Sequence, residues 1–182
     1  MKLVALSRFI AALGITAAIT LSGCSLLSRS THQPYIQRAT QIADALGRNA
    51  NNQLAAYETC WDMGNECGYV IAFTTQDSIA TIESRLTTVG LSATVSAGLT
   101  ISNYSVIGTL SSDPSTRSKL QQVGSKSATS PSRHESYGWM PKEKDGRIIT
   151  VMLYTTANWP NHFAFDGKPI VDDVVEVVVR YP

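Results

Sequence analysis

An uncharged run near the N-terminus, from Phe9 to Ser28, decides how much of this chain is left to fold. Lys2 and Arg8 precede it, and its most apolar part extends from Phe9 to Leu21. A positive segment, a short apolar segment and then small residues are the layout of a secretory signal peptide. A transmembrane anchor is the alternative, because about 20 uncharged residues can cross a bilayer. Glycine, serine and threonine dilute the run and favour the signal peptide.

The sequence LSGC, residues 21–24, stands at the end of the apolar part. It resembles the lipobox of bacterial lipoproteins, in which a diacylglycerol is joined to the cysteine thiol and the chain is cleaved just before that cysteine. The resemblance covers only the first 24 residues, and it implies that Cys24 is lipidated and that residues 1–23 are a signal peptide. Two or more acyl chains hold a protein stably on a membrane. Because Ser25 follows, and not an aspartate, we expect the outer membrane, facing the periplasm, in organisms that sort lipoproteins by this residue.

Once Cys24 is assigned to lipid, two of the three cysteines remain, and Cys60 and Cys67 form an even pair. Disulfides persist in oxidising compartments, and Gly64 and Asn65 allow the chain to reverse between the two cysteines. We therefore predict a Cys60–Cys67 disulfide. The alternatives are a zinc-binding pair, which lacks the second Cys or His pair of such sites, and a nucleophilic thiol, for which the sequence shows no partner base.

Composition predicts a folded domain that does not bind nucleic acid. Of the 182 residues, 43% are hydrophobic and 16% are charged, which is typical of a packed core. Without residues 1–23, the chain has 13 basic and 14 acidic residues, a formal net charge of −1. Nucleic-acid binding needs clustered Lys and Arg to neutralise phosphates, so we expect no nucleic-acid partner.

The spacing of apolar residues predicts both helices and strands. Between Pro34 and Thr59 they recur at steps of three and four, which predicts an amphipathic helix, divided in two where Gly47 and Asn49 weaken it. Further helices are predicted over 79–89, with Asp77 or Ser78 as the cap, and over 113–124. Strands are predicted over 68–75, 91–97, 99–110, 147–155 and 174–181. Loops are predicted over 125–136, which is rich in serine, and 156–173.

This order predicts an α+β fold: a two-layer sandwich with a mainly antiparallel or mixed sheet, helices on one face, and a ferredoxin-like arrangement in part. The helix over 79–89 would be a crossover between the strands that flank it. We expect residues 34–182 to form one domain, joined to the lipid by a short tether over 24–33 and carrying a flexible serine-rich loop.

Local motifs indicate no catalytic centre, cofactor or metal site. The three histidines, His32, His134 and His162, lie in no HExxH or paired pattern, and no GxSxG elbow is present. Carboxylates approach one another in two places, each of which could grip a cation, but a solvated strand start and a polar loop tip are the simpler interpretations. These carboxylates are Asp172, Asp173 and Glu176, and Asp62 and Glu66.

Aromatic residues concentrate in segments that are predicted as connections. Tryptophan and tyrosine are enriched where proteins bind one another, and loops often display function. The alternative is that these rings fold back to complete the core. The candidates for partner binding are Trp61, Tyr137, Trp139, Trp159, His162, Phe163 and Phe165.

We therefore expect a membrane-anchored, non-enzymatic protein that binds another protein. Small size, a lipid anchor and aromatic loops favour an inhibitor or immunity-type lipoprotein that neutralises an effector acting in the periplasm, by analogy alone. An accessory lipoprotein of an envelope secretion or conjugation assembly is one alternative. Another is a cell-wall or lipid hydrolase whose site is assembled from distant residues such as His162, Asp166 and Asp173.

Overall fold

The computed structural model describes most of the chain after residue 31. The described residues are 32–61, 66–91, 96–97, 104–125, 136–140, 143, 145–156 and 161–181. Tyr35–Pro182 form one compact unit, and Met1–Pro34 are separate from it. None of the helices in the described ranges is long and apolar enough to span a bilayer.

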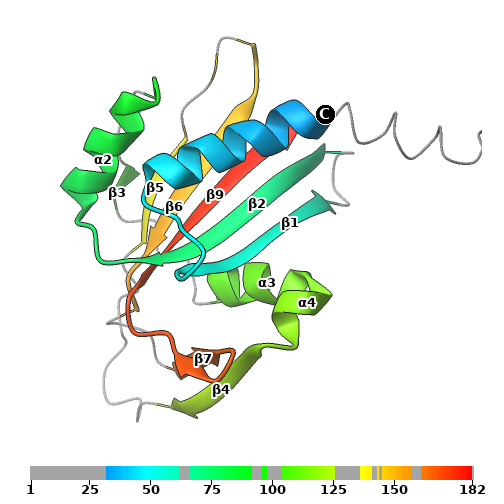
Figure 1. Cartoon of the computed structure of the whole chain (residues 1–182), viewed down its shortest axis with the longest axis vertical. Helices are drawn as coiled ribbons and strands as arrows, with labels where there is room; N and C mark the ends of the chain where they lie inside the picture. The colour runs from blue at the N-terminus through cyan, green and yellow to red at the C-terminus, as the bar shows by residue number, and fades with distance from the viewer. Residues whose placement is uncertain are drawn as a thin grey trace, which may run out of the picture. The chain divides into compact units, whose positions relative to one another are not determined.

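A six-stranded antiparallel sheet is the centre of the compact unit (Figure 1). Its order is β1-β2-β9-β6-β5-β3. The strand β9 lies between β2 and β6, and every residue from Val174 to Val179 is buried. A strand that is covered on both faces needs apolar side chains at successive positions, which explains the run VVEVVV. The strands are β1 (Gln53–Trp61), β2 (Glu66–Thr75), β3 (Ser96–Ala97), β5 (Ser136–Trp139), β6 (Ile148–Tyr154) and β9 (Asp173–Tyr181).

Helices and a second sheet accompany this central sheet, so the predicted α+β class is confirmed. The second sheet is also antiparallel and has the order β4-β7-β8, with β4 at Leu120–Ser125, β7 at Asn161–Phe165 and β8 at Lys168–Pro169. The helices are an N-terminal helix over residues 32–45, α2 (Ile79–Thr88), α3 (Tyr104–Ser112) and α4 (Pro114–Arg117).

The first face of the central sheet packs against the N-terminal helix and α2. The apolar steps of three and four place one stripe of the N-terminal helix on the sheet. Ser78 caps α2, because its hydroxyl accepts a hydrogen bond from the Thr81 amide at 3.3 Å. Gly90, at φ +78°, ends α2 as the sequence predicts. The buried cluster includes Ala39, Ile42, Ala43, Leu46, Ile71, Phe73, Ile82, Leu86, Trp139, Val151, Val175 and Val177.

The second face carries a layer that the sequence analysis did not predict, since helices were expected on one face only. Leu110 of α3 and Phe163 of β7 pack on this face. Their partners are the residues that alternate with those of the first face, namely Ala55, Ala72, Met152, Tyr154 and Val174. The central sheet is therefore covered on both sides, and a two-layer description is incomplete.

The predicted helix over 34–59 is wrong in its second half. The helix ends at residue 45, Gly47 follows at φ +97°, and residues 53–61 form β1. Gly47 is the break that the sequence suggested, but the next segment pairs with β2 as a hairpin. Apolar residues at steps of three and four in 50–57 also satisfy a twisted edge strand with a bulge near Ala55. Pairing with β2 makes this segment a strand and not a helix.

Four other predicted segments are also corrected. The predicted strand over 99–110 is helical from Tyr104, as α3, and residues 98–103 lie outside the described ranges. The predicted helix over 113–124 begins with the expected Asp113 cap but ends at Arg117, and β4 follows. The predicted loop over 156–173 contains β7 and β8, and the YGW segment that was predicted as a connection is β5.

The strands joined by the predicted crossover run parallel, as expected. They are not neighbours in the sheet, as a ferredoxin-like arrangement would require. α2 connects β2 to β3, and these strands run the same way because four antiparallel pairings separate them. However, β9, β6 and β5 lie between β2 and β3. The two strands of the crossover are therefore not close neighbours.

The predicted disulfide is present. Cys60 and Cys67 are bonded, and they lie directly opposite each other in the β1–β2 ladder with a Cα–Cα distance of 4.0 Å. Residues 62–65 of the hairpin, with Asp62, lie outside the described ranges. The bond closes the end of the hairpin at the sheet edge.

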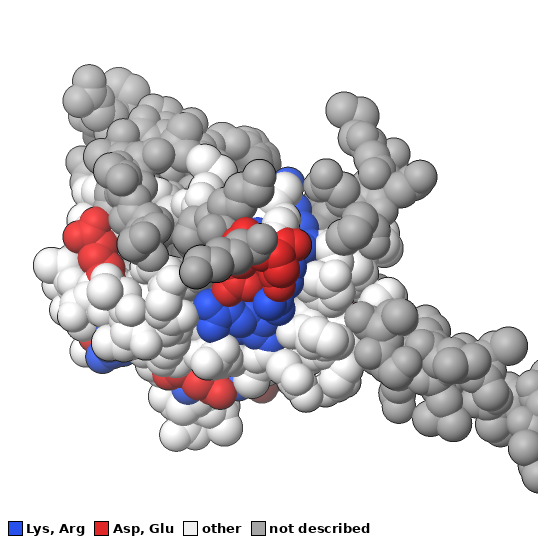
Figure 2. Space-filling model, turned by 90° about the horizontal axis from the view of Figure 1, so that it is seen from above, with Lys and Arg blue, Asp and Glu red and all other residues white. Residues whose placement is uncertain are grey.

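Ion pairs gather at the end of the sheet where β6 begins. Glu143 accepts contacts from Arg38 of the N-terminal helix at 2.5 Å and from Arg147 at 3.0 Å, and Arg147 also contacts Asp145 at 2.5 Å. Seen from above the view of Figure 1, basic and acidic side chains lie against one another in one cluster (Figure 2). This network joins the N-terminal helix to the segment before β6.

Candidate functional site

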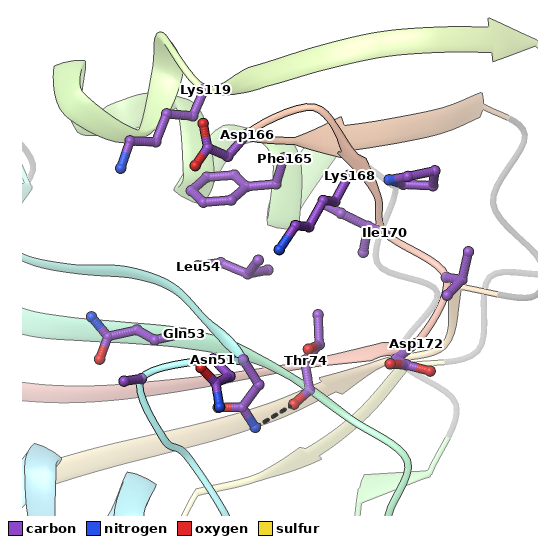
Figure 3. A pocket seen from close by; sticks show the side chains of 14 residues that line it. Asn51, Gln53, Leu54, Thr74, Lys119, Phe165, Asp166, Lys168, Ile170 and Asp172 are labelled. Carbon is purple, nitrogen blue, oxygen red and sulfur yellow. Dashed lines mark hydrogen bonds between the residues drawn. The ribbon is translucent and has the colours of Figure 1, made fainter.

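A groove of about 580 Å³ lies at the opposite end of the sheet, where β9 begins (Figure 3). One wall is the segment that leads into β1, and the other is the β7–β8 hairpin with the residue before β4. Its lining residues are Ala50, Asn51, Asn52, Gln53, Leu54, Thr74, Lys119, Phe165, Asp166, Lys168, Pro169, Ile170, Val171 and Asp172. The groove thus combines residues that are far apart in the sequence.

The wall beside β1 is fixed by the side chain of Asn52. Its amide nitrogen donates to the Thr74 carbonyl at 3.0 Å and to the Gly47 carbonyl at 3.1 Å. Its amide oxygen accepts from the Asn49 backbone at 2.7 Å. The Asn52 side chain therefore connects the turn after the N-terminal helix to the end of β2. The same hydrogen bonds hold Asn51 and Gln53 at the groove.

The hairpin wall depends on a two-residue turn. Asp166 has φ +52° and Gly167 has φ +75°, and both central residues of a type I′ turn have positive φ. The turn places Phe165 directly opposite Lys168. In addition, the Asp166 amide donates to the Lys119 carbonyl at 2.9 Å, which joins the turn to the chain before β4.

Charges of both signs line the groove. The Lys119 ammonium lies 5.9 Å from the centre of the Phe165 ring, a cation–π distance. Asp172 accepts a hydrogen bond from Gln76 at 3.1 Å. The Lys168 side chain extends into the groove near Leu54 (Figure 3), and within the described part of the chain its ammonium has no ion pair. A ligand can therefore meet an available cation beside the Leu54 and Phe165 side chains.

A buried acid lies on the second face, away from the groove lining. Burial raises the pKa of Glu176 to about 7, although a hydrogen bond from the Thr109 side chain and the charge of Arg180 lower it. The nearby Tyr57 hydroxyl donates to the Thr109 carbonyl at 2.6 Å. Burial, and then the charge of Glu176, raise the pKa of Tyr57 to about 12. These contacts attach α3 to the sheet and make that attachment sensitive to the charge on Glu176.

The predicted aromatic set is dispersed by the fold. Among the members of this set whose side chains the structure describes, Phe165 is the one that lines the groove. Trp139 is 0% exposed and Phe163 is 8% exposed, so both are core residues and the expectation that they face a partner is corrected. Tyr137 is half-buried against the first-face core. Trp61 ends β1 and His162 lies in β7, but their side chains, like Trp159 and Cys24 as a whole, lie outside the described part.

The predicted carboxylate group is also divided. Asp172 lines the groove, Asp173 accepts a hydrogen bond from the Thr156 amide at 3.0 Å, and Glu176 is buried on the second face. Within the described ranges, no three His, Cys, Asp or Glu side chains gather closely enough to hold a metal ion. The set His162, Asp166 and Asp173 likewise has Asp166 in the hairpin turn and Asp173 engaged elsewhere.

The sequence analysis missed Lys119, Lys168 and Val171 as site residues. One signal was available, because Asp-Gly between FAF and KPI is the strongest short-range indication of a hairpin. It predicts that Phe165 and Lys168 face each other across the turn. No local signal indicates that residues 50–54 form the other wall.

Comparisons with models of protein families, with curated proteins and with solved structures found no match to this chain.

Proposed function

We propose that this protein is a bacterial lipoprotein, anchored to the outer membrane by lipid on Cys24, that binds a protein partner in the groove. In this proposal it is an inhibitor or immunity-type protein that neutralises an effector acting in the periplasm. The observation that carries the proposal is the groove itself, with the Lys168 ammonium beside Leu54, Phe165 and Ile170. Such a site suits a partner that presents an acidic side chain next to an apolar one.

The charges that line the groove can select a partner. Complementary charges across an interface fix how the two proteins meet and exclude wrong partners. Val171 extends the apolar surface, because 75% of its side chain is exposed beside the groove. Asp166 and Asp172 would repel a partner that presents only carboxylates, so they favour one acidic group at a defined position.

The position of the groove in the fold supports a tethered role. Tyr35, the first residue of the compact unit, lies against Tyr181 at the end of β9. The groove lies where β9 begins, and a nine-residue strand is roughly 26 Å long at about 3.3 Å per residue. The groove therefore lies at the other end of β9 from Tyr35, the residue at which the sequence that follows Cys24 enters the compact unit.

The proposal expects a toxic protein to be encoded beside this gene, and the test is a challenge of the bacterium with that protein. Deletion of the gene should make cells sensitive, and the wild-type gene should restore protection. Lys168→Glu should abolish protection and weaken binding of the purified toxin at least about tenfold, because like charges in contact cost several kcal/mol. Gln37→Glu, on an exposed position of the N-terminal helix, is the matched control and should protect normally.

Two results would contradict the proposal. The first is a deletion strain that resists attack as well as its parent. The second is full protection by Lys168→Glu. Copurification with a large membrane assembly, without any change in sensitivity, would favour an accessory lipoprotein of an envelope machine instead.

A further inference from the structure

A second hollow, of about 290 Å³, lies at the end of the sheet where the chain enters the compact unit. The rings of Tyr35 and Tyr181 are 4.7 Å apart there, and the Arg147 guanidinium lies 6.0 Å from the centre of the Tyr35 ring. The hollow is lined by Tyr35, Asp145, Gly146, Arg147, Ile148, Arg180 and Tyr181, which we call the anchor face. It therefore combines tyrosine rings, guanidinium groups and an aliphatic side chain.

Exposed apolar side chains accompany the anchor face. Ile148 is 43% exposed at the start of β6. Met140 is 62% exposed and follows Trp139, which pairs with Val151, so Met140 extends toward the same end of the sheet. Tyrosine rings and long basic side chains with apolar neighbours are the chemistry that proteins use at a bilayer surface. Each arginine near an anionic membrane surface adds about 1 kcal/mol of attraction.

The sequence before Tyr35 limits how far this end can be from a lipid on Cys24. Ten residues, 25–34, separate Cys24 from Tyr35, and even a fully extended chain of this length spans at most about 40 Å. A connection this short gives its attached surface an effective concentration in the millimolar range. Weak affinity for phospholipid is then sufficient to hold the anchor face on the bilayer.

We infer that the anchor face rests on the bilayer, with Arg147 and Arg180 toward phospholipid phosphates and Ile148 in the interfacial region. This inference rests on the proposed lipidation of Cys24. Arg147 keeps donors for a phosphate because a guanidinium has five N–H groups and only part of them face Glu143 and Asp145. The two carboxylates weaken the attraction, so this contact orients the protein, while the acyl chains hold it.

The test uses a single probe at each end of the sheet in the lipidated full-length mature chain. With Cys24 lipidated and Cys60 bonded to Cys67, Ile148→Cys introduces one free thiol for an environment-sensitive fluorophore. Val171→Cys is the matched control at the groove. In vesicles that contain anionic phosphatidylglycerol with brominated acyl chains, the probe at Ile148 should lose most of its fluorescence, and the probe at Val171 should keep its own.

Two further arms identify the contact. Vesicles of zwitterionic phosphatidylcholine, or the additional change Arg180→Gln, should reduce quenching at Ile148 and leave the Val171 signal unchanged. Equal quenching at both positions, or none at either in chains that float with the vesicles, would overturn the inference while the anchor stands. Chains that do not float with the vesicles would overturn both the anchor and the inference.

Discussion

The two faces of the central sheet are covered by different kinds of side chain. Among the described residues, the first face has a cluster of sixteen buried apolar residues from the N-terminal helix, α2 and the sheet. The second face has a cluster of eight, and the carboxylate of Glu176 is buried in the same layer. One fold therefore contains an apolar interface and an interface whose stability depends on a proton. The second layer also supplies the β7–β8 hairpin of the groove.

The largest effect is expected from the first face. Trp139 is fully buried there, and its indole nitrogen has no hydrogen-bond partner among the described atoms. Trp139→Ala should lower the free energy of unfolding by about 3–5 kcal/mol through lost burial and a cavity, as measured by urea denaturation. Trp139→Phe should cost clearly less, because it keeps apolar volume and removes the unpaired donor. Equal losses for the two variants would show that Trp139 is not packed as described.

The same contrast between faces explains which elements the sequence predicted. On the first face, the stripe from Ala39 to Leu46 and the capped helix α2 have a regular apolar period, so local pattern and tertiary packing agree. On the second face, LTISNYSVIGTL alternates like a strand, yet residues from Tyr104 form α3. Its single glycine and its β-branched residues have low helix propensity, and packing of Leu110 on the sheet outweighs it.

The groove could not be predicted from local sequence patterns, for a related reason. Its walls come from residues 50–54, 74, 119 and 165–172, and only the fold brings them together. The disulfide was predictable because, with Cys24 set aside as the expected lipid attachment, the two remaining cysteines have one pairing. The positions of the aromatic rings were not, since the sequence of β5 does not state which face each side chain occupies, and Trp139 faces the core.

A second prediction sharpens the contrast through pH. The pKa of Glu176 is raised to about 7 in the folded protein, from about 4.3 in an unfolded chain. Between these values the folded state keeps a proton that the unfolded state has lost, so stability falls as the pH rises and levels off above about 7. The loss should be about 4 kcal/mol at most, at 1.36 kcal/mol per pKa unit.

Urea denaturation from pH 4 to pH 8 measures this slope, and Glu176→Gln should flatten it. Glu83→Gln, on α2 of the first face, keeps Glu176 and should therefore keep the slope. A wild-type slope that survives in Glu176→Gln would assign the proton to another group. In that case the second layer would be as insensitive to pH as the first.

The smallest effect is expected from a Gly→Ala change made at one position beside each face of the sheet. Gly90 after α2 and Gly167 in the β7–β8 turn have φ of +78° and +75°, and a Cβ at either position would meet nothing within 4 Å. Each Gly→Ala change should therefore cost only the conformational penalty of a left-handed residue, about 1–2 kcal/mol.

Equal losses in global stability would show that both layers unfold with the sheet. If instead Gly167→Ala leaves the denaturation midpoint unchanged and speeds amide exchange only in β7 and β8, the hairpin opens by itself. The groove wall would then be a separate, weaker unit, and Lys168 would be presented to a partner by a segment that can move without the core.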